Sequence, residues 1–293
     1  MDFNAYMKER AGWLEAALTR SIQDESIPET LRRAMRYSLE AGGKRLRPML
    51  CFAGAEAVGG SADRVMPVAA ALEMIHTFSL IHDDLPAMDD DSMRRGKPTS
   101  HKVFGEAIAI LAGDGLLAEA FSVLSVLHGG VAPELMLATI NDIASATGGR
   151  GMTGGQVIDI ESTKASLDEA ALARLHRYKT GALIKVSATS GARICGATHE
   201  QLEALGRYGE CVGLAFQIAD DILDVEGDEK LIGKDVGSDQ AKGKSTYPAA
   251  IGLAASKGQA KALVDQALSA VSIFGEAAEP LRQIARYTVE RKR

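Results

Sequence analysis

Apolar residues recur every three or four positions along almost the whole chain, which is the spacing of amphipathic helices. Near the N-terminus, this spacing places one set of side chains on a common face of a first helix: Tyr6, Trp13, Leu14, Ala17 and Leu18. No run that alternates between apolar and polar residues is long enough to predict a sheet. We therefore expect an all-α protein, and the lack of an internal repeat or a low-complexity linker predicts a single domain over residues 1–293.

Prolines and glycine pairs mark where the expected helices begin and end. Pro28 and Pro48 are predicted to begin the second and third helices, and the glycine pairs at 42–43 and 59–60 to end them. Further helices are expected over about 66–84, 133–148 and 198–225, with a polar loop at 86–101, a capping box at 166–169 and a Gly/Asp/Lys-rich loop at 226–247.

Composition narrows the classes of protein that fit. The net charge of -6 argues against a nucleic-acid-binding protein. Three cysteines without metal-binding spacing, and an N-terminus without an apolar signal segment, predict a cytoplasmic protein with reduced thiols. The most apolar stretch, 107–127, is interrupted by Asp114 and Glu119, so we expect no membrane span there. The sequence suggests no partner for Asp114.

Two acidic clusters carry the candidate chemistry. Asp83 and Asp84 end the long fourth helix, and Asp89 follows a proline-containing bend. Anions at a helix C-terminus are unfavourable unless a cation lies opposite them. The second cluster is Gln217, Asp220, Asp221 and Asp224, whose spacing puts three carboxylates and an amide on one side of a helix. Such carboxylates suit Mg²⁺ with a phosphorylated ligand, although solvated acidic patches remain the simpler alternative.

Basic segments near the expected loops could bind anions. Lys44 and Arg47 follow a glycine pair at the start of the third helix, a turn that can present both cations and backbone N–H groups. The further candidates are Arg94, Arg95, Lys179, Lys234 and Lys244. Glu73 and His76 have the Glu-x-x-His spacing of di-iron bundles, but no second copy occurs, so a core or phosphate-contacting role suits His76 better.

Taken in order, these motifs resemble the trans-isoprenyl diphosphate synthases, and more narrowly the bacterial farnesyl diphosphate synthases (geranyltranstransferases). The resemblance covers roughly residues 35–250 and rests on Gly-Gly-Lys44-Arg-Leu-Arg47-Pro, His76, the two aspartate motifs, Arg94-Arg95-Gly, Gly154-Gly155-Gln156, Lys179-Thr180 and Gly-Lys244-Ser-Thr-Tyr-Pro. It implies a large helical bundle around a central active-site cavity, a homodimer, and Mg²⁺-dependent condensation of isopentenyl diphosphate with an allylic diphosphate.

The resemblance also implies residue roles. It assigns the metal site to Asp83, Asp84, Asp89, Asp220, Asp221 and Asp224. It assigns the allylic diphosphate to Arg94, Lys179 and Lys234, the diphosphate of isopentenyl diphosphate to Lys44, Arg47, His76 and Arg95, and stabilisation of the allylic cation to Thr180 and Gln217, with Lys244 as a further substrate contact. Apart from the resemblance, the loop 226–247 and the basic C-terminal residues Arg291–Arg293 are candidates for closing over the substrate.

Product length is expected to depend on the residues beneath the first aspartate motif. Ser79 lies one helical turn before Asp83, and Phe78 lies about 7.5 Å below it along the axis. A bulky aromatic there, and the Pro86-Ala87 expansion of the motif, resemble short-chain synthases and predict a C15 product, with C20 as the alternative. A class I terpene cyclase would need no second diphosphate site, and a non-catalytic synthase subunit should have decayed acidic motifs.

Overall fold

The chain folds almost entirely into helices, as a computed structural model describes it for all residues except 127–129, 164, 166, 227–242 and 292–293. The first half contains α1 Phe3–Ser21, α2 Glu29–Leu39, α3 Leu46–Ala57, α4 Ala62–Asp83, β1 Met93–Arg94, β2 Lys97–Pro98, α5 Ser100–Phe104, α6 Glu106–Ser125 and α7 Pro133–Thr147. The second half contains α8 Met152–Glu161, α9 Glu169–His176, a π turn η1 Arg177–Gly181, α10 Ala182–Ile194, α11 His199–Glu226, α14 Tyr247–Ile251, α15 Leu253–Ala270, a 3₁₀ segment η2 Ser272–Ala278 and α16 Glu279–Glu290. The expected all-α class is confirmed.

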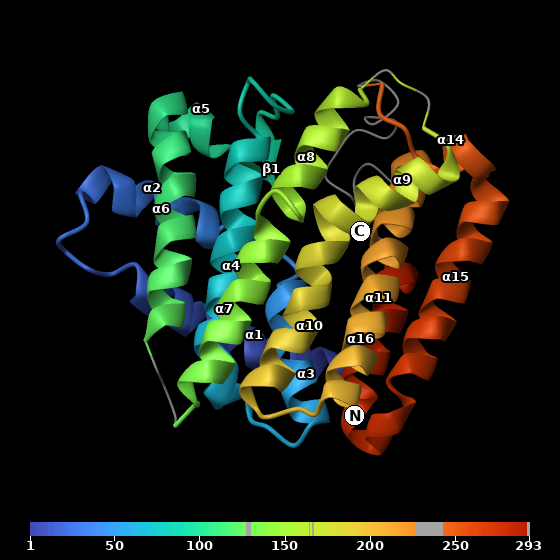
Figure 1. The fold of residues 1–293 in the computed structure, drawn as a ribbon. Coiled ribbons are helices and arrows are strands. Elements are labelled where there is room, and N and C mark those ends of the chain that lie inside the picture. The colour runs from blue at the N-terminus through green and yellow to red at the C-terminus, as the bar shows by residue number, and fades with distance from the viewer. Residues whose placement is uncertain (127–129, 164, 166, 227–242, 292–293) are drawn as a thin grey trace.

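The centre of the bundle is formed by α3 and α10, which pack against each other. Almost every residue of α3 is buried, as expected for a helix that is apolar on all sides. Close contact depends on two glycines, because a Cβ atom at Gly54 would collide with the carbonyl oxygen of Ala188, and one at Gly191 with that of Cys51. Around this pair lie α4, α7 and α11, which run beside it in Figure 1, with α6 against α4 and α15 against α11.

The helix boundaries confirm most of the expected elements and correct some. The third helix begins at Leu46 rather than Pro48, because a proline in the first turn needs no N–H partner. The fourth begins at Ala62 and carries Pro67 inside it, earlier than the expected start near residue 66. Of the residues expected on one face of the first helix, Leu14 is buried, whereas Trp13 is 41% exposed and contacts the Arg10 guanidinium.

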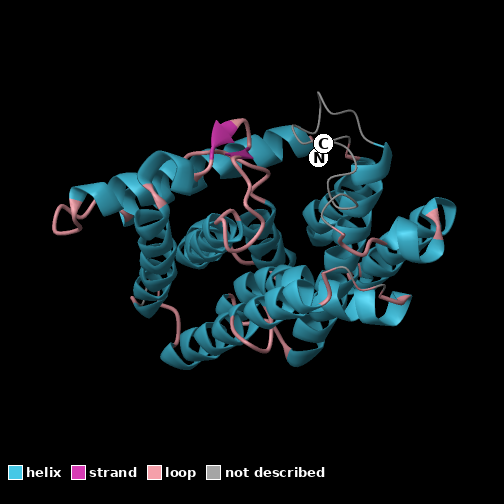
Figure 2. Ribbon diagram, turned by 90° about the horizontal axis from the view of Figure 1, so that it is seen from above, coloured by secondary structure: helices cyan, strands magenta, loops and turns pink. Residues whose placement is uncertain are grey.

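The expected polar loop at 86–101 contains a small hairpin, drawn in magenta in Figure 2, in which β1 pairs antiparallel with β2. Arg95 and Gly96 connect the strands with φ values of 53° and 75°. Positive φ at both central residues is the requirement of a type I′ turn, which suits hairpins of this length. The strands are too short for periodicity to predict them, so the sequence reading missed the element that carries Arg94 and Arg95.

The cap of α9 also differs from expectation. Asp168, not Ser166, is the N-cap, and its side chain accepts a hydrogen bond from the backbone N–H of Ala171 at 2.8 Å. Ser166 itself lies outside the described residues. An aspartate cap suits the position because its carboxylate also complements the positive end of the helix dipole.

Two described helices, α4 and α6, are long and apolar enough to cross a membrane by length and composition alone. The apolar window of α4 is 61% buried within the bundle, whereas that of α6 is only 33% buried. Burial of this kind is typical of a core helix, so the apolar character of α4 needs no membrane to explain it. The apolar face of α6, by contrast, is left partly uncovered.

Candidate active site

A central cavity of about 1210 Å³ brings most of the candidate residues together. The predicted residues that line it are Lys44, Arg47, His76, Phe78, Ser79, Asp83, Asp89, Arg94, Arg95, Lys179, Thr180, Gln217 and Asp220. Asp84, Asp221, Asp224 and Lys244 are not among its lining residues, and Lys234 lies outside the described part of the chain. Segments more than a hundred residues apart in sequence therefore meet around one space.

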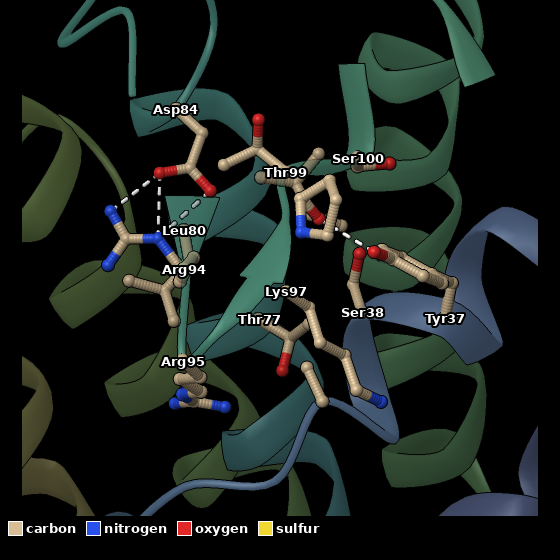
Figure 3. A pocket seen from close by; sticks show the side chains of 13 residues that line it. Tyr37, Ser38, Thr77, Leu80, Asp84, Arg94, Arg95, Lys97, Thr99 and Ser100 are labelled. Carbon is tan, nitrogen blue, oxygen red and sulfur yellow. Dashed lines mark hydrogen bonds and ion pairs between the residues drawn. The ribbon is translucent and has the colours of Figure 1, made fainter. Parts of the chain in front are cut away.

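The carboxylates of the first acidic cluster are held at the end of α4. The backbone N–H of Asp89 donates to the carbonyl oxygen of Asp83 at 2.9 Å, which closes the turn between them. Arg94 Nη2 lies 2.6 Å from Asp84 Oδ1, and the guanidinium also donates through Nε (Figure 3). Lys244 Nζ lies 2.8 Å from Asp89 Oδ1. Cations that the sequence suggested for phosphate binding thus neutralise carboxylates here.

Asp83 differs from its neighbours because burial dominates its environment. Burial raises the pKa of Asp83 to about 6; Lys179 opposes this shift, and the nearby Asp89 and Asp84 add to it. A carboxylate that is costly to ionise without a partner gains most when a cation arrives. Asp83 is therefore well placed to contact a metal ion.

The second acidic cluster divides into two environments. Asp220 faces the cavity, and its Oδ1 lies 2.7 Å from Arg291 Nη2. Asp221 is buried instead: its Oδ2 accepts from the backbone N–H of Tyr247 at 2.9 Å, and His176 Nε2 lies 3.5 Å away. The rings of His176 and Tyr247 stack with centroids 5.7 Å apart. No signal in the sequence pointed to His176, and although Tyr247 belongs to the Gly-Lys244-Ser-Thr-Tyr-Pro motif, nothing in the sequence predicted its contact with Asp221.

A group of cationic residues, called the cationic region, lines the same cavity as Asp83, Asp89 and Asp220. Arg95 reaches the carbonyl oxygen of Gly42 and packs so closely on Gly43 that a Cβ atom there would collide with the guanidinium. Arg47 Nε and His76 Nδ1 are buried and have no hydrogen-bond partner. Unpartnered buried polar atoms are rare and costly, which indicates that a ligand supplies the missing hydrogen-bond partners. An anion is the ligand that suits this charge.

Burial and the surrounding arginines keep His76 neutral. Burial lowers the pKa of His76 well below its usual value, and Arg47 and Arg95 lower it further. Burial also lowers the pKa of Arg47 to about 10, a value at which the guanidinium stays charged near neutral pH. The region therefore offers fixed positive charge from arginine and a neutral hydrogen-bonding group from histidine.

The π turn η1 places Lys179 and Thr180 on the cavity wall. Single π turns within helices are rare and are frequent at functional sites, because they displace backbone carbonyl groups from the regular ladder. Lys179 Nζ lies 2.6 Å from Asp159 Oδ2 of α8, and Thr180 Oγ1 donates to Gln217 Oε1 at 3.0 Å. The sequence analysis did not select Asp159, although it lies three residues after Gln156 of the Gly154-Gly155-Gln156 motif.

Phe78 and His82, from the last turns of α4, both line the cavity, and this part of it is called the lower wall. Their rings meet edge to face, with centroids 5.4 Å apart. His82 Nε2 lies 3.0 Å from the carbonyl oxygen of Ile110 and 3.9 Å from Asp114 Oδ1, which identifies the partner that the sequence left open. Ser79 Oγ donates to the His76 carbonyl at 2.9 Å, so its hydroxyl is satisfied within α4.

The donor set fits Mg²⁺ that arrives with a phosphorylated ligand. Among the described residues, no group of three His, Cys, Asp or Glu side chains is gathered closely enough to hold a metal ion alone. Mg²⁺ needs no such cage, since it commonly binds through one or two carboxylates together with waters and substrate phosphates. Asp83, Asp89 and Asp220 line the cavity and are the candidates for that role.

A second pocket, which Asp84 and Arg94 help to line, lies between α2, α4 and the hairpin (Figure 3). Tyr37 closes it by donating its hydroxyl to the carbonyl oxygen of Pro98 at 2.7 Å. Its volume of about 30 Å³ has room for little more than a water molecule. This pocket cannot hold a diphosphate, so the central cavity is the candidate site.

Comparison with known proteins gives consistent matches. The profile of the polyprenyl synthetase family matches residues 28–279. The chain is 49% identical over 253 residues to a farnesyl diphosphate synthase of Geobacillus stearothermophilus, covering 86% of this chain and 85% of that protein. It is 47% identical over 291 residues to geranylgeranyl pyrophosphate synthase 11 of Arabidopsis thaliana, covering 98% and 81%. The crystal structure of an FPP/GFPP synthase from Zymomonas mobilis aligns with a TM-score of 0.88 at 38% identity, covering 98% of this chain and 99% of the other.

Proposed function

Because the chain belongs to the polyprenyl synthetase family and is a prenyltransferase, we propose that it condenses isopentenyl diphosphate with dimethylallyl or geranyl diphosphate to give farnesyl diphosphate. The observation that carries this proposal is the single cavity in which carboxylates, a separate cationic region and an aromatic lower wall meet. The carboxylates suit a metal-bound diphosphate, and the cationic region suits a second one.

We assign Mg²⁺ to the acidic end of this cavity. Asp83, Asp89 and Asp220 line the cavity and would contact the ion directly. Asp84, Asp221 and Asp224 remain candidate ligands from the motif pattern, although Asp221 also supports Tyr247. When bound, Mg²⁺ would neutralise negative charge on the allylic diphosphate.

The chain's own residues would then perform the transfer. Lys179, Arg94, Lys234 and Lys244 would donate hydrogen bonds to the allylic diphosphate as it leaves. These hydrogen bonds would stabilise the negative charge that develops on the diphosphate. The double bond of isopentenyl diphosphate attacks the allylic cation, and the released diphosphate accepts the proton that is lost. Thr180 and Gln217, which contact each other on the wall, offer oxygen atoms to the cation.

Lys44, Arg47, His76 and Arg95 would hold the isopentenyl diphosphate. Arg47 Nε and His76 Nδ1 are among the buried atoms that lack hydrogen-bond partners, and phosphate oxygens would satisfy them. Lys44 Nζ lies 6.0 Å from the ring centre of Phe216, and both residues line the cavity.

We assign a C15 product on the strength of Phe78. Its ring lines the cavity and packs against His82, which in turn contacts α6. The C20 product is the alternative, because relatives of similar identity include both farnesyl and geranylgeranyl synthases.

A product assay tests the proposal. The purified protein should convert dimethylallyl diphosphate and excess labelled isopentenyl diphosphate into a mainly C15 product, resolved as the dephosphorylated alcohol. Chelation of Mg²⁺ should abolish turnover, and re-addition should restore it. A longer product would support the proposed prenyl transfer but contradict the C15 product length. If the folded protein, supplied with Mg²⁺, made no elongated product, the proposed reaction itself would be wrong.

A homodimer would explain the uncovered apolar face of α6. Ile110 and Leu111 are 42% and 53% exposed, and the carbonyl of Ile110 supports His82 of the lower wall. We therefore propose that a second copy packs on α6. Leu111→Asp should shift the mass measured by light scattering from twice 31.0 kDa towards 31.0 kDa, because a buried unpaired charge disfavours association. Ile273→Asp, on the equally exposed Ile273 of η2, is the matched control and should stay dimeric; a dimeric Leu111→Asp protein would rule out this face.

Net charge and cysteine content bear on the binding partners and the cellular location of the protein. The substrates are small diphosphates, and the net charge of -6 disfavours nucleic acid as a partner. We also propose a cytoplasmic location, with Cys51, Cys195 and Cys211 as free thiols.

A further inference from the structure

Arg45 lies within the basic turn but has no part in the mechanism above. It is the N-cap residue of α3 and adopts the left-handed conformation, with φ 49° and ψ 31°. Residues with a Cβ atom are disfavoured in this region, so the surrounding structure must hold the conformation in place. Its neighbours Lys44 and Arg47 both line the cavity. The conformation of Arg45 therefore sets the direction in which these two cations leave the turn.

The guanidinium of Arg45 joins several helices. Arg45 Nε and Nη2 donate to Glu15 Oε1 of α1 at 2.8 Å and 2.6 Å. Nη1 donates to Glu73 Oε1 of α4 at 2.6 Å, and Nη2 donates to the carbonyl oxygen of Leu39 at the end of α2 at 2.6 Å. These bonds occupy most of the donors that a guanidinium has. Arg45 is only 4% exposed, so it binds protein rather than substrate.

Glu73 is the buried counter-charge of the cationic region. Its side chain is 1% exposed, and Oε2 has no hydrogen-bond partner while Oε1 holds Arg45. Its charge raises the pKa of Arg47, against the larger lowering by burial. Glu73 also lies three residues before His76, on the neighbouring turn of α4. One carboxylate is thus bonded to the turn and placed beside the residues proposed to bind the second diphosphate.

We propose that Arg45 and Glu73 are positioning residues for the isopentenyl diphosphate subsite. Their ion pair fixes the turn that carries Lys44 and Arg47 to the helix that carries His76, so that all three converge on one diphosphate. This inference rests on the proposed function. It separates the two arginines of the Lys44-Arg-Leu-Arg47 motif into one that binds and one that positions.

Arg45→Lys tests the proposal, because it keeps the charge and loses the planar fork that reaches three partners at once. The KM for isopentenyl diphosphate should rise about tenfold or more, while the KM for the allylic diphosphate changes by less than about twofold. Arg36→Lys is the control, since Arg36 pairs with Glu40 on the exposed side of α2, and it should leave both constants unchanged. If the role of Arg45 were merely structural, the two KM values of the folded variant would change together or not at all. Either result would overturn the proposal.

A second variant keeps the test decisive if Arg45→Lys does not fold. Glu15→Gln weakens the more exposed partner of Arg45, which is 43% exposed, and leaves the buried Glu73 pair in place. It should give the same selective change in smaller measure, with a melting temperature near that of the wild type; equal KM changes for both substrates would refute positioning. Calorimetric titration of the wild type with isopentenyl diphosphate separates this from the proposed function. If isopentenyl diphosphate does not bind to the wild type, the proposed function is wrong. The positioning role is then tested with inorganic diphosphate: weaker binding to Arg45→Lys than to the wild type supports it, and equal binding refutes it.

Discussion

Asp83→Asn should lower kcat by about a thousandfold or more, which corresponds to roughly 4 kcal/mol of lost transition-state stabilisation. Asn keeps the size of the side chain but removes the charge that would contact Mg²⁺. The physical basis is the burial that raises the pKa of Asp83 to about 6, since a carboxylate in this setting gains most from an arriving cation. Steady-state turnover of dimethylallyl diphosphate with saturating isopentenyl diphosphate would measure the loss.

Asp114→Asn is the matched control for this experiment. Asp114 is another aspartate near α4, but its side chain is 60% exposed and lies 3.9 Å from His82 rather than in the cavity. The control should retain nearly full activity, as exposed ion pairs contribute little. If Asp83→Asn retained wild-type kcat at saturating Mg²⁺, Asp83 would not be a metal ligand.

Phe78→Ala should change the main product from C15 to C20 or longer. Loss of the ring removes apolar surface that lines the cavity, and each added isoprene unit needs more space there. The neighbouring His82 would remain in place, held by the carbonyl oxygen of Ile110. The measurement is the chain-length distribution of the dephosphorylated alcohols at a fixed substrate ratio, with folding verified by thermal denaturation because truncating a packed aromatic is destabilising.

Phe104→Ala controls for a general loss of packing. Phe104 packs edge to face on Tyr37 at 5.5 Å and does not line the cavity. It should lower stability without altering the product. An unchanged C15 product from Phe78→Ala would remove this residue from chain-length control, while a longer product from Phe104→Ala would show that general loosening, rather than the lower wall, sets the length.

Local spacing was enough to predict the parts of the fold that local physics determines. The apolar period predicted the long helices, and the i, i+1, i+4 spacing placed Asp220, Asp221 and Asp224 on one side of α11. The sequence could not show that Asp221 turns to Tyr247 while Asp220 faces the cavity, because both share the same local pattern. The π turn at Lys179 was invisible for a similar reason, since nothing in the apolar period distinguishes it from regular helix.

Charge partners were the second part that spacing could not supply. The sequence suggested phosphate for Arg94, Lys179 and Lys244, but in this structure each of them holds a carboxylate. These pairs form between segments distant along the chain, so they depend on the tertiary fold.

The separation between the charged end of the cavity and the Phe78 wall has a consequence for evolution. Groups assigned to the chemistry are tied together by ion pairs, so most substitutions there would damage the reaction itself. Phe78 and His82 are joined by a ring contact that involves no charged partner from the acidic clusters. Selection could therefore change chain length by altering one side chain while leaving catalysis untouched. Related enzymes that make products of different length should then differ mainly at this wall. Overall sequence identity should therefore be a poor guide to product chain length.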